Sequence, residues 1–147
     1  MNTKRLLKLA EFLRTVPVKR FDYTKWVGKD WKGSQNLSCG TTACALGWAV
    51  TIPSFRKAGL RFKNSSFENL FGETIMQADI VLRSPKTKRL LTSESLRTAE
   101  MFFGLTDDQA VWLFTPQGGE SFATPKYVAQ KIERFVKGEA AIGHPSY

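Results

Sequence analysis

The chain has a single histidine and two cysteines among its 147 residues, and this scarcity removes several kinds of site. A structural zinc site takes four nitrogen or sulfur ligands, more than Cys39, Cys44 and His144 supply. A Ser-His-Asp triad fails because that histidine lies in the C-terminal segment and no Gly-x-Ser-x-Gly elbow is present. No glycine pattern of a Walker loop or a dinucleotide-binding turn occurs either. We therefore expect no metal and no cofactor.

Long apolar runs are also missing. The longest, 43–50, is far short of the ~20 residues that cross a bilayer. Charged residues interrupt the apolar positions of 6–14, so the N-terminus lacks the core of a signal peptide. We expect a cytoplasmic protein that does not enter membranes, with both cysteines as thiols.

Positive charge is abundant and unevenly distributed. The net charge is +9, with thirteen Lys and Arg against three acids in residues 1–63 and nine against ten in residues 64–147. A field of one sign over part of the surface attracts anionic partners. The alternative is a solvated basic face that only maintains solubility.

Apolar spacing and capping residues predict several helices. The first covers 3–15, with its apolar positions on one face, and is followed by a loop-like stretch over 18–40. Thr41 or Thr42 would cap a helix of small residues over 43–50, and a short helix through Phe55 would end at Gly59. Three more are expected from Ser93 to Gly104, after the capping box Thr106–Gln109, and from Thr124-Pro125 to Gly138.

The segment 60–92 is less regular. Residues 60–63 alternate as a strand does, and 75–82 offers a partner strand interrupted by Asp79. We thus predict a mainly α fold: one compact domain over 1–138 with four to five helices and at most a small β-hairpin in the middle. Residues 139–147 would form a flexible tail.

The segment Cys39–Cys44 resembles a reactive site. Cys39 would precede a helix N-terminus, where amide dipoles stabilise a thiolate, and Cys44 is close enough to act as a resolving thiol. A thiol-dependent enzyme or redox protein using Cys39 and Cys44 is therefore one hypothesis. The alternative is that Cys44 is an inert, buried small residue on an Ala/Gly-rich helix, and without a dependable histidine base we favour it.

Three segments carry a family resemblance. FDYTKW at 21–26, CGTTACALGWA at 39–49 and Phe-Phe-Gly-Leu-Thr at 102–106 resemble a group of small bacterial and phage proteins with an FDM-x-x-W segment followed by CGT-x-x-CA-x-GWA. The resemblance covers about two thirds of the chain. Tyr23 replaces Met, and 27–38 is an insertion between the motifs. The resemblance implies a bacterial or phage origin and a shared small fold, without an activity.

The insertion region and one later loop supply candidate binding residues. Lys residues neutralise phosphates and Trp rings stack on unpaired bases, so a segment that alternates them is typical of nucleic-acid binding. The alternative is that the rings pack on the core. The candidates are Lys25, Trp26, Lys29, Trp31 and Lys32, with Lys86, Lys88 and Arg89 in support.

These observations favour a non-catalytic accessory protein, phage-encoded if the resemblance holds, acting in the host cytoplasm. Its basic N-terminal half would bind nucleic acid or an acidic host-protein surface. A phage inhibitor of a host defence or transcription protein is an alternative that would present the same surface.

Overall fold

The computed structural model describes residues 1–28, 31, 33–37 and 41–138, and within them it is a mixed α/β fold. The helices are α1 (Thr3–Leu13), α2 (Ala45–Val50), α3 (Pro53–Lys57), α4 (Ser95–Phe103), α5 (Asp107–Phe114) and α6 (Pro125–Val136), with short 3-10 turns η1 (Val18–Arg20) and η2 (Glu120–Phe122). The strands are β1 (Leu60–Asn64), β2 (Phe67–Glu68), β3 (Thr74–Ile75), β4 (Ala78–Arg83) and β5 (Leu90–Thr92).

The predicted mainly α class is therefore wrong. A three-stranded antiparallel sheet has the order β1-β4-β5, and β2 pairs with β3 in a separate two-stranded ladder. The predicted pair of strands exists as β1 and β4, with Leu60 opposite Leu82. The other three strands have two or three residues each, which is too short for an alternation pattern to appear in the sequence.

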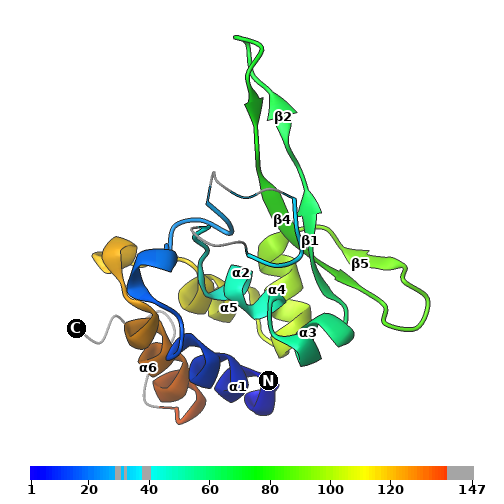
Figure 1. Ribbon diagram of the computed structural model, residues 1–147. Coiled ribbons are helices and arrows are strands. Elements are labelled where there is room, and N and C mark those ends of the chain that lie inside the picture. The colour runs from blue at the N-terminus through cyan, green and yellow to red at the C-terminus, as the bar shows by residue number, and fades with distance from the viewer. Residues whose placement is uncertain (29–30, 32, 38–40, 139–147) are drawn as a thin grey trace.

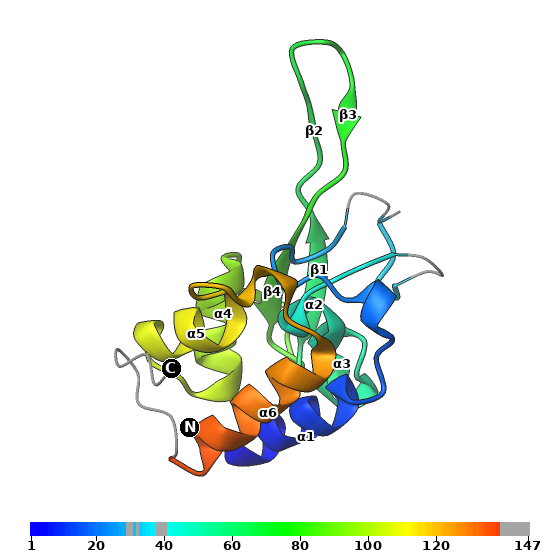
Figure 2. The ribbon, with the colours of Figure 1, turned by 90° about the vertical axis from the view of Figure 1, so that its left-hand side faces the viewer.

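The buried face of each long helix follows the predicted spacing. In α1 the buried residues are Leu6, Leu9, Ala10 and Leu13, and in α6 they include Val128, Ile132 and Phe135. The two helices lie side by side (Figures 1 and 2), and Arg14, the residue that caps the C-terminus of α1, forms an ion pair of 2.5 Å with Glu133 of α6. Their packing forms one side of the core.

Four phenylalanines join α3, α4 and α5 in the core. Phe55, Phe102 and Phe103 contact one another edge to face, with ring centroids 4.9 to 5.9 Å apart. Phe114 of α5 stacks on Phe103 at 5.3 Å. Since aromatic pairs in these geometries add to the burial term, the cluster stabilises the α3–α4–α5 junction.

Helix ends agree with the predicted capping in the C-terminal third. Both hydrogen bonds of the Thr106–Gln109 capping box form, and Thr124 caps α6 ahead of Pro125. Gly104 ends α4 in the left-handed conformation. Elsewhere the boundaries differ: Cys44, not Thr41 or Thr42, is the N-cap of α2, and Glu94 rather than Ser93 precedes α4.

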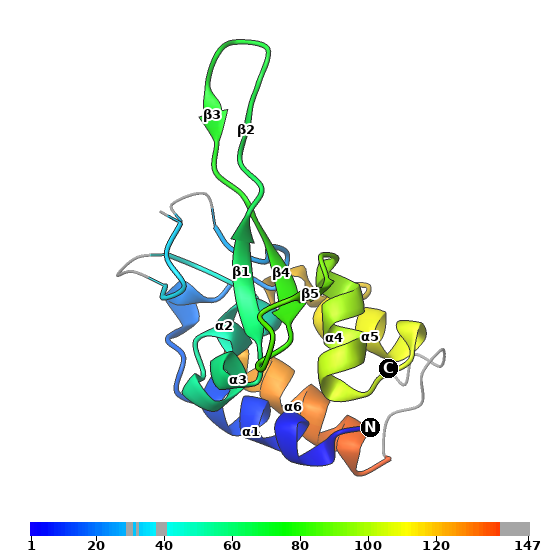
Figure 3. The ribbon, with the colours of Figure 1, turned by 90° about the vertical axis from the view of Figure 1, so that its right-hand side faces the viewer.

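The β1–β4 hairpin extends beyond the sheet and gives the molecule its shape. Ser65 donates to the carbonyl of Gln77 at 2.9 Å, and β2 and β3 continue the pairing outward. The hairpin projects from the body on the side opposite to α1 and α6 (Figures 1 to 3). The described residues between 33 and 37 lie beside β1 (Figure 3), where the Gln35 side chain forms hydrogen bonds of 2.8 Å with both the amide and the carbonyl of Phe62.

Candidate anion-binding surface

The first predicted binding segment is fastened to the start of α2. The Cys44 amide donates to the Lys25 carbonyl at 2.8 Å, and the Gly28 amide donates to Thr42 at 2.7 Å. A Cβ at Gly47 would lie 2.1 Å from the Trp26 carbonyl oxygen, so this glycine permits the close approach. Lys25 is exposed, whereas Trp26 is half-buried against the core.

Trp31 does not offer a ring face to a ligand. Its side chain is 2% exposed, its Nε1 donates to the Ser34 carbonyl at 2.8 Å, and its ring packs on Phe62 at 5.9 Å. Trp31 therefore belongs to the core, which agrees with the alternative that its ring packs in the protein and does not stack on a base. Lys29 and Lys32 lie outside the described residues.

The second predicted segment forms an exposed turn between β4 and β5. The Ser84 amide donates to the Arg89 carbonyl and the Lys88 amide to the Ser84 carbonyl, both at 2.8 Å. Lys88 adopts a positive φ of 63°, and its carbonyl accepts from Arg83 Nη1 at 3.1 Å. Lys86, Lys88 and Arg89 are all exposed.

Beside this turn the fold places three arginines that the sequence reasoning missed. Arg61 lies opposite Val81 in the β1–β4 ladder, so Arg83, two residues further along β4, shares its face of the sheet. Arg61 also donates through Nη1 to the Arg56 carbonyl at the end of α3. Val81 is buried but lies outside the main core cluster, so this face is the one turned away from the core.

Arg61 is close enough to Arg56 and Arg83 for their charges to act on it. Burial is the main cause that lowers the pKa of Arg61, and the charges of Arg56 and Arg83 lower it further. All three donate to neutral oxygens: Arg56 to the Gln35 carbonyl and Asn36 Oδ1, Arg61 to backbone, and Arg83 to Lys88. Among the described residues, none of the three forms an ion pair with a carboxylate.

We call the resulting set the basic surface. It consists of Arg56, Arg61, Arg83, Lys86, Lys88 and Arg89. Figure 3 shows its elements, α3, β1, β4 and the turn that leads into β5, on one side of the molecule. Lys25 lies next to the start of α2, where its carbonyl accepts from the Cys44 amide, and so belongs to a different part of the fold from the 86–89 turn.

The alternation of Leu60-Arg61-Phe62-Lys63 was the available signal for part of this surface. It places Arg61 and Lys63 on the face opposite the buried Leu60 and Phe62. The pairing of β1 with β4, which brings Arg83 to Arg61, depends on tertiary structure. For that reason the sequence could not join Arg56 and Arg61 to the 86–89 turn.

Cys44 has none of the properties of a nucleophile. It is 1% exposed and a free thiol, and burial raises its pKa to about 12. A thiolate is the reactive form, so Cys44 is inert in the folded protein. Cys39, the other half of the redox hypothesis, lies outside the described residues.

A second group of ionisable side chains is buried on the far side of the core. Lys131 forms an ion pair with Glu120 at 2.7 Å, donates to Tyr23 Oη at 3.0 Å and lies 4.6 Å from the centre of the Trp112 ring. Burial lowers the pKa of Lys131. Burial alone would raise the pKa of Glu120, but hydrogen bonds from Lys131, Gln117 and Tyr127 outweigh it and leave that pKa lowered. These bonds attach the 117–123 segment to α6, which is a structural role.

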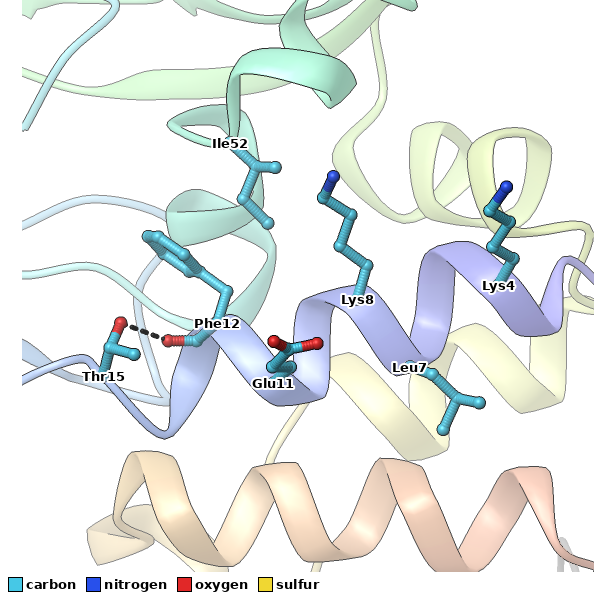
Figure 4. Close-up of a pocket in the computed structure, with 7 residues that line it drawn as sticks. All are labelled: Lys4, Leu7, Lys8, Glu11, Phe12, Thr15 and Ile52. Atoms are coloured by element: carbon cyan, nitrogen blue, oxygen red, sulfur yellow. Dashed lines mark hydrogen bonds between the residues drawn. The ribbon is translucent and has the colours of Figure 1, made fainter.

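An open groove of about 550 Å³ runs along α1 (Figure 4). Leu7, Phe12 and Ile52 supply its apolar side chains. Lys4 and Lys8 extend along one side of it, and Glu11 and Thr15 complete the lining. The groove therefore combines apolar surface with positive charge.

No helix among the described residues is long and apolar enough to cross a membrane. Within the same part of the chain, no group of three or more His, Cys, Asp and Glu side chains is placed to hold a metal ion. Comparison with protein-family models, with curated proteins and with solved structures found no match to the chain.

Proposed function

We propose that this protein is a non-catalytic accessory protein that binds the phosphate backbone of nucleic acid through the basic surface. The observation that carries the proposal is the group of Arg56, Arg61 and Arg83, whose guanidiniums lie together without a carboxylate partner among the described residues. Like charges held together destabilise the folded chain, and a bound polyanion would relieve that repulsion.

The neighbouring β4–β5 turn adds exposed cationic side chains to the three arginines. Lys86, Lys88 and Arg89 are exposed and reach into solvent from the β4–β5 turn. Arginine forks bind phosphate oxygens in a bidentate manner, and lysine contributes a point charge. Trp31 is buried, so the proposal rests on backbone contacts and predicts little preference for base sequence.

Because the family resemblance implies a bacterial or phage origin, we propose that the protein acts in the cytoplasm of a bacterial host. An acidic surface of a host protein would bind to the same cations. Binding experiments with DNA and with poly-glutamate distinguish these two kinds of partner. Lys25, Lys29 and Lys32 remain proposed contributors from a separate region beside α2.

Binding of fluorescently labelled duplex and single-stranded DNA tests the proposal by anisotropy at low salt. We expect Lys86→Glu with Arg89→Glu to weaken binding at least tenfold, because both side chains are exposed and their loss leaves the fold intact. The matched control is Lys126→Glu with Lys137→Glu on and beside α6, which changes net charge equally at exposed positions.

Equal weakening by both pairs would show a response to net charge alone and would contradict the assigned surface. No DNA binding together with binding of poly-glutamate that the first pair abolishes would assign the surface to an acidic protein. A Lys29→Glu/Lys32→Glu variant that keeps its fold and full affinity would remove the segment beside α2 from the proposal.

A further inference from the structure

The tip of the long hairpin presents two apolar side chains to solvent. Leu70 is fully exposed and Phe71 is 86% exposed, at the end of the β2–β3 ladder furthest from the body (Figure 1). Exposed apolar side chains gathered at one point mark an interaction site more often than scattered ones do.

Hydrogen bonds hold this tip in one shape. Asn69 Oδ1 accepts from the amides of Phe71 at 2.9 Å and Glu73 at 3.0 Å, and the Asn69 amide donates to the Glu73 carbonyl at 2.9 Å. Gly72, at φ 76°, supplies the left-handed residue that closes the turn. A tip already ordered loses little conformational entropy on binding.

The charge of the hairpin indicates what it binds. Residues 64–82 contain Glu68, Glu73 and Asp79 and no lysine or arginine, in a chain of net charge +9. Glu68 and Glu73 lie on either side of Leu70 and Phe71 and oppose any contact with phosphate. The complementary surface is apolar with a basic edge.

The α1 groove of this chain has that chemistry. Its apolar lining consists of Leu7, which is 43% exposed, the half-buried Phe12 and the buried Ile52, and Lys4 and Lys8 outnumber Glu11 among its charged residues. The tip and α1 are at opposite ends of the molecule in all three views of the ribbon. Two copies side by side in opposite directions therefore place each tip near the partner's α1.

We propose that the protein forms a two-fold dimer in which the Leu70–Phe71 tip of each copy occupies the α1 groove of the other. The two contacts are identical, so the assembly closes at two subunits. Leu70 and Phe71 bury their side chains, and Glu68 and Glu73 lie near Lys4 and Lys8. This inference is independent of nucleic-acid binding.

Sedimentation of nuclease-treated full-length protein over a hundredfold concentration range tests the dimer. We expect reversible dimerisation that weakens about a hundredfold in Leu70→Ser/Phe71→Ser, whose altered side chains are solvent-exposed in the monomer. Phe122→Ser is the control, since Phe122 is an equally exposed aromatic elsewhere on the surface.

Charge reversal identifies the groove. Glu68→Lys/Glu73→Lys and Lys4→Glu/Lys8→Glu should each weaken the dimer, and the four changes together should restore it. A monomer at every concentration, a tip variant that dimerises like the control, or a fourfold variant without recovery would each overturn the proposal.

Discussion

At the scale of single residues, a few buried polar groups connect parts of a core that is otherwise apolar. The side chains of Lys131 and Glu120 are only 5% and 12% exposed, and their opposite charges form an ion pair. Tyr23, which the motif resemblance singled out only as a departure from Met, donates its hydroxyl to the Leu113 carbonyl at 2.5 Å and accepts from Lys131. Removing any member leaves a buried charge or donor without its partner.

Lys131→Met tests the importance of that pair. We expect a loss of about 3 kcal/mol in the free energy of unfolding, because the Glu120 carboxylate loses its buried cation. Urea denaturation followed by tryptophan fluorescence measures it. The double variant Lys131→Met/Glu120→Gln should recover part of the loss, and equal losses in single and double variants would contradict this assignment.

Glu120 should also make the free energy of unfolding depend on pH in the acidic range. Its pKa in the folded protein is below the ordinary value of 4.5, so the unfolded chain binds its proton first as pH falls. The stabilisation is complete at pH well above 4.5 and is lost as pH falls through the lowered pKa. Thermal unfolding from pH 6 to pH 2 should show a shallower decline for Glu120→Gln than for the native chain; parallel curves would argue against it.

Cys44 should not react in the folded protein. In a Cys39→Ser variant we expect iodoacetamide to modify Cys44 only after denaturation, because the thiol is buried and its pKa is about 12. Mass spectrometry of intact protein measures the labelling. Rapid labelling without denaturant would contradict the assignment of Cys44 as a buried, unreactive thiol.

At the scale of elements, the join between α3 and β1 determines where the basic surface forms. Gly59 has φ 108°, and its backbone lies so close to Arg83 that an added Cβ would be 1.9 Å from the Arg83 carbonyl oxygen. This approach brings the end of α3 against β4 and thereby places Arg56 near Arg61 and Arg83.

Gly59→Ala should accordingly cost about 3 kcal/mol, since it adds a backbone clash to the strain of a positive φ. Gly119→Ala is the matched control: φ is 82° and no atom lies within 4 Å of the added Cβ, so only the strain of ~1 kcal/mol applies. Chemical denaturation of both variants measures the difference. Similar losses in the two would show that the close approach contributes nothing.

At the scale of the whole molecule, charge is divided among regions of different sign. The basic surface lies on the sheet side of the body, and the acidic hairpin extends away from it. This separation supports the proposal that a polyanion binds to the body, and it leaves the hairpin tip for the contact with a second copy that we propose.

Salt dependence of DNA binding should report this division. Each phosphate contact releases counterions, so the slope of log affinity against log salt should fall by about two in Lys86→Glu/Arg89→Glu. The Lys126→Glu/Lys137→Glu control should keep the native slope. Anisotropy titrations at several salt concentrations measure both, and identical slopes in all three proteins would contradict localised contacts.

Local physical chemistry explains which features the sequence by itself determined. The buried face of α1, the Thr106–Gln109 capping box and the Thr124-Pro125 start of α6 depend on spacings of three or four residues, and all are confirmed. The sequence could not decide where the Trp31 ring lies. Its packing on Phe62 is a contact between residues far apart in the sequence, which local spacing does not predict.

Tertiary structure alone decided the rest. Strands of two or three residues leave no periodic pattern, so the mixed α/β class became visible only when β1, β4 and β5 paired. Pairing also moved Arg83 beside Arg61, although one belongs to the acidic half of the sequence and the other to the basic half. Net charge is fixed by composition, but the place where charge gathers is fixed by strand register, because register selects which side chains share a face.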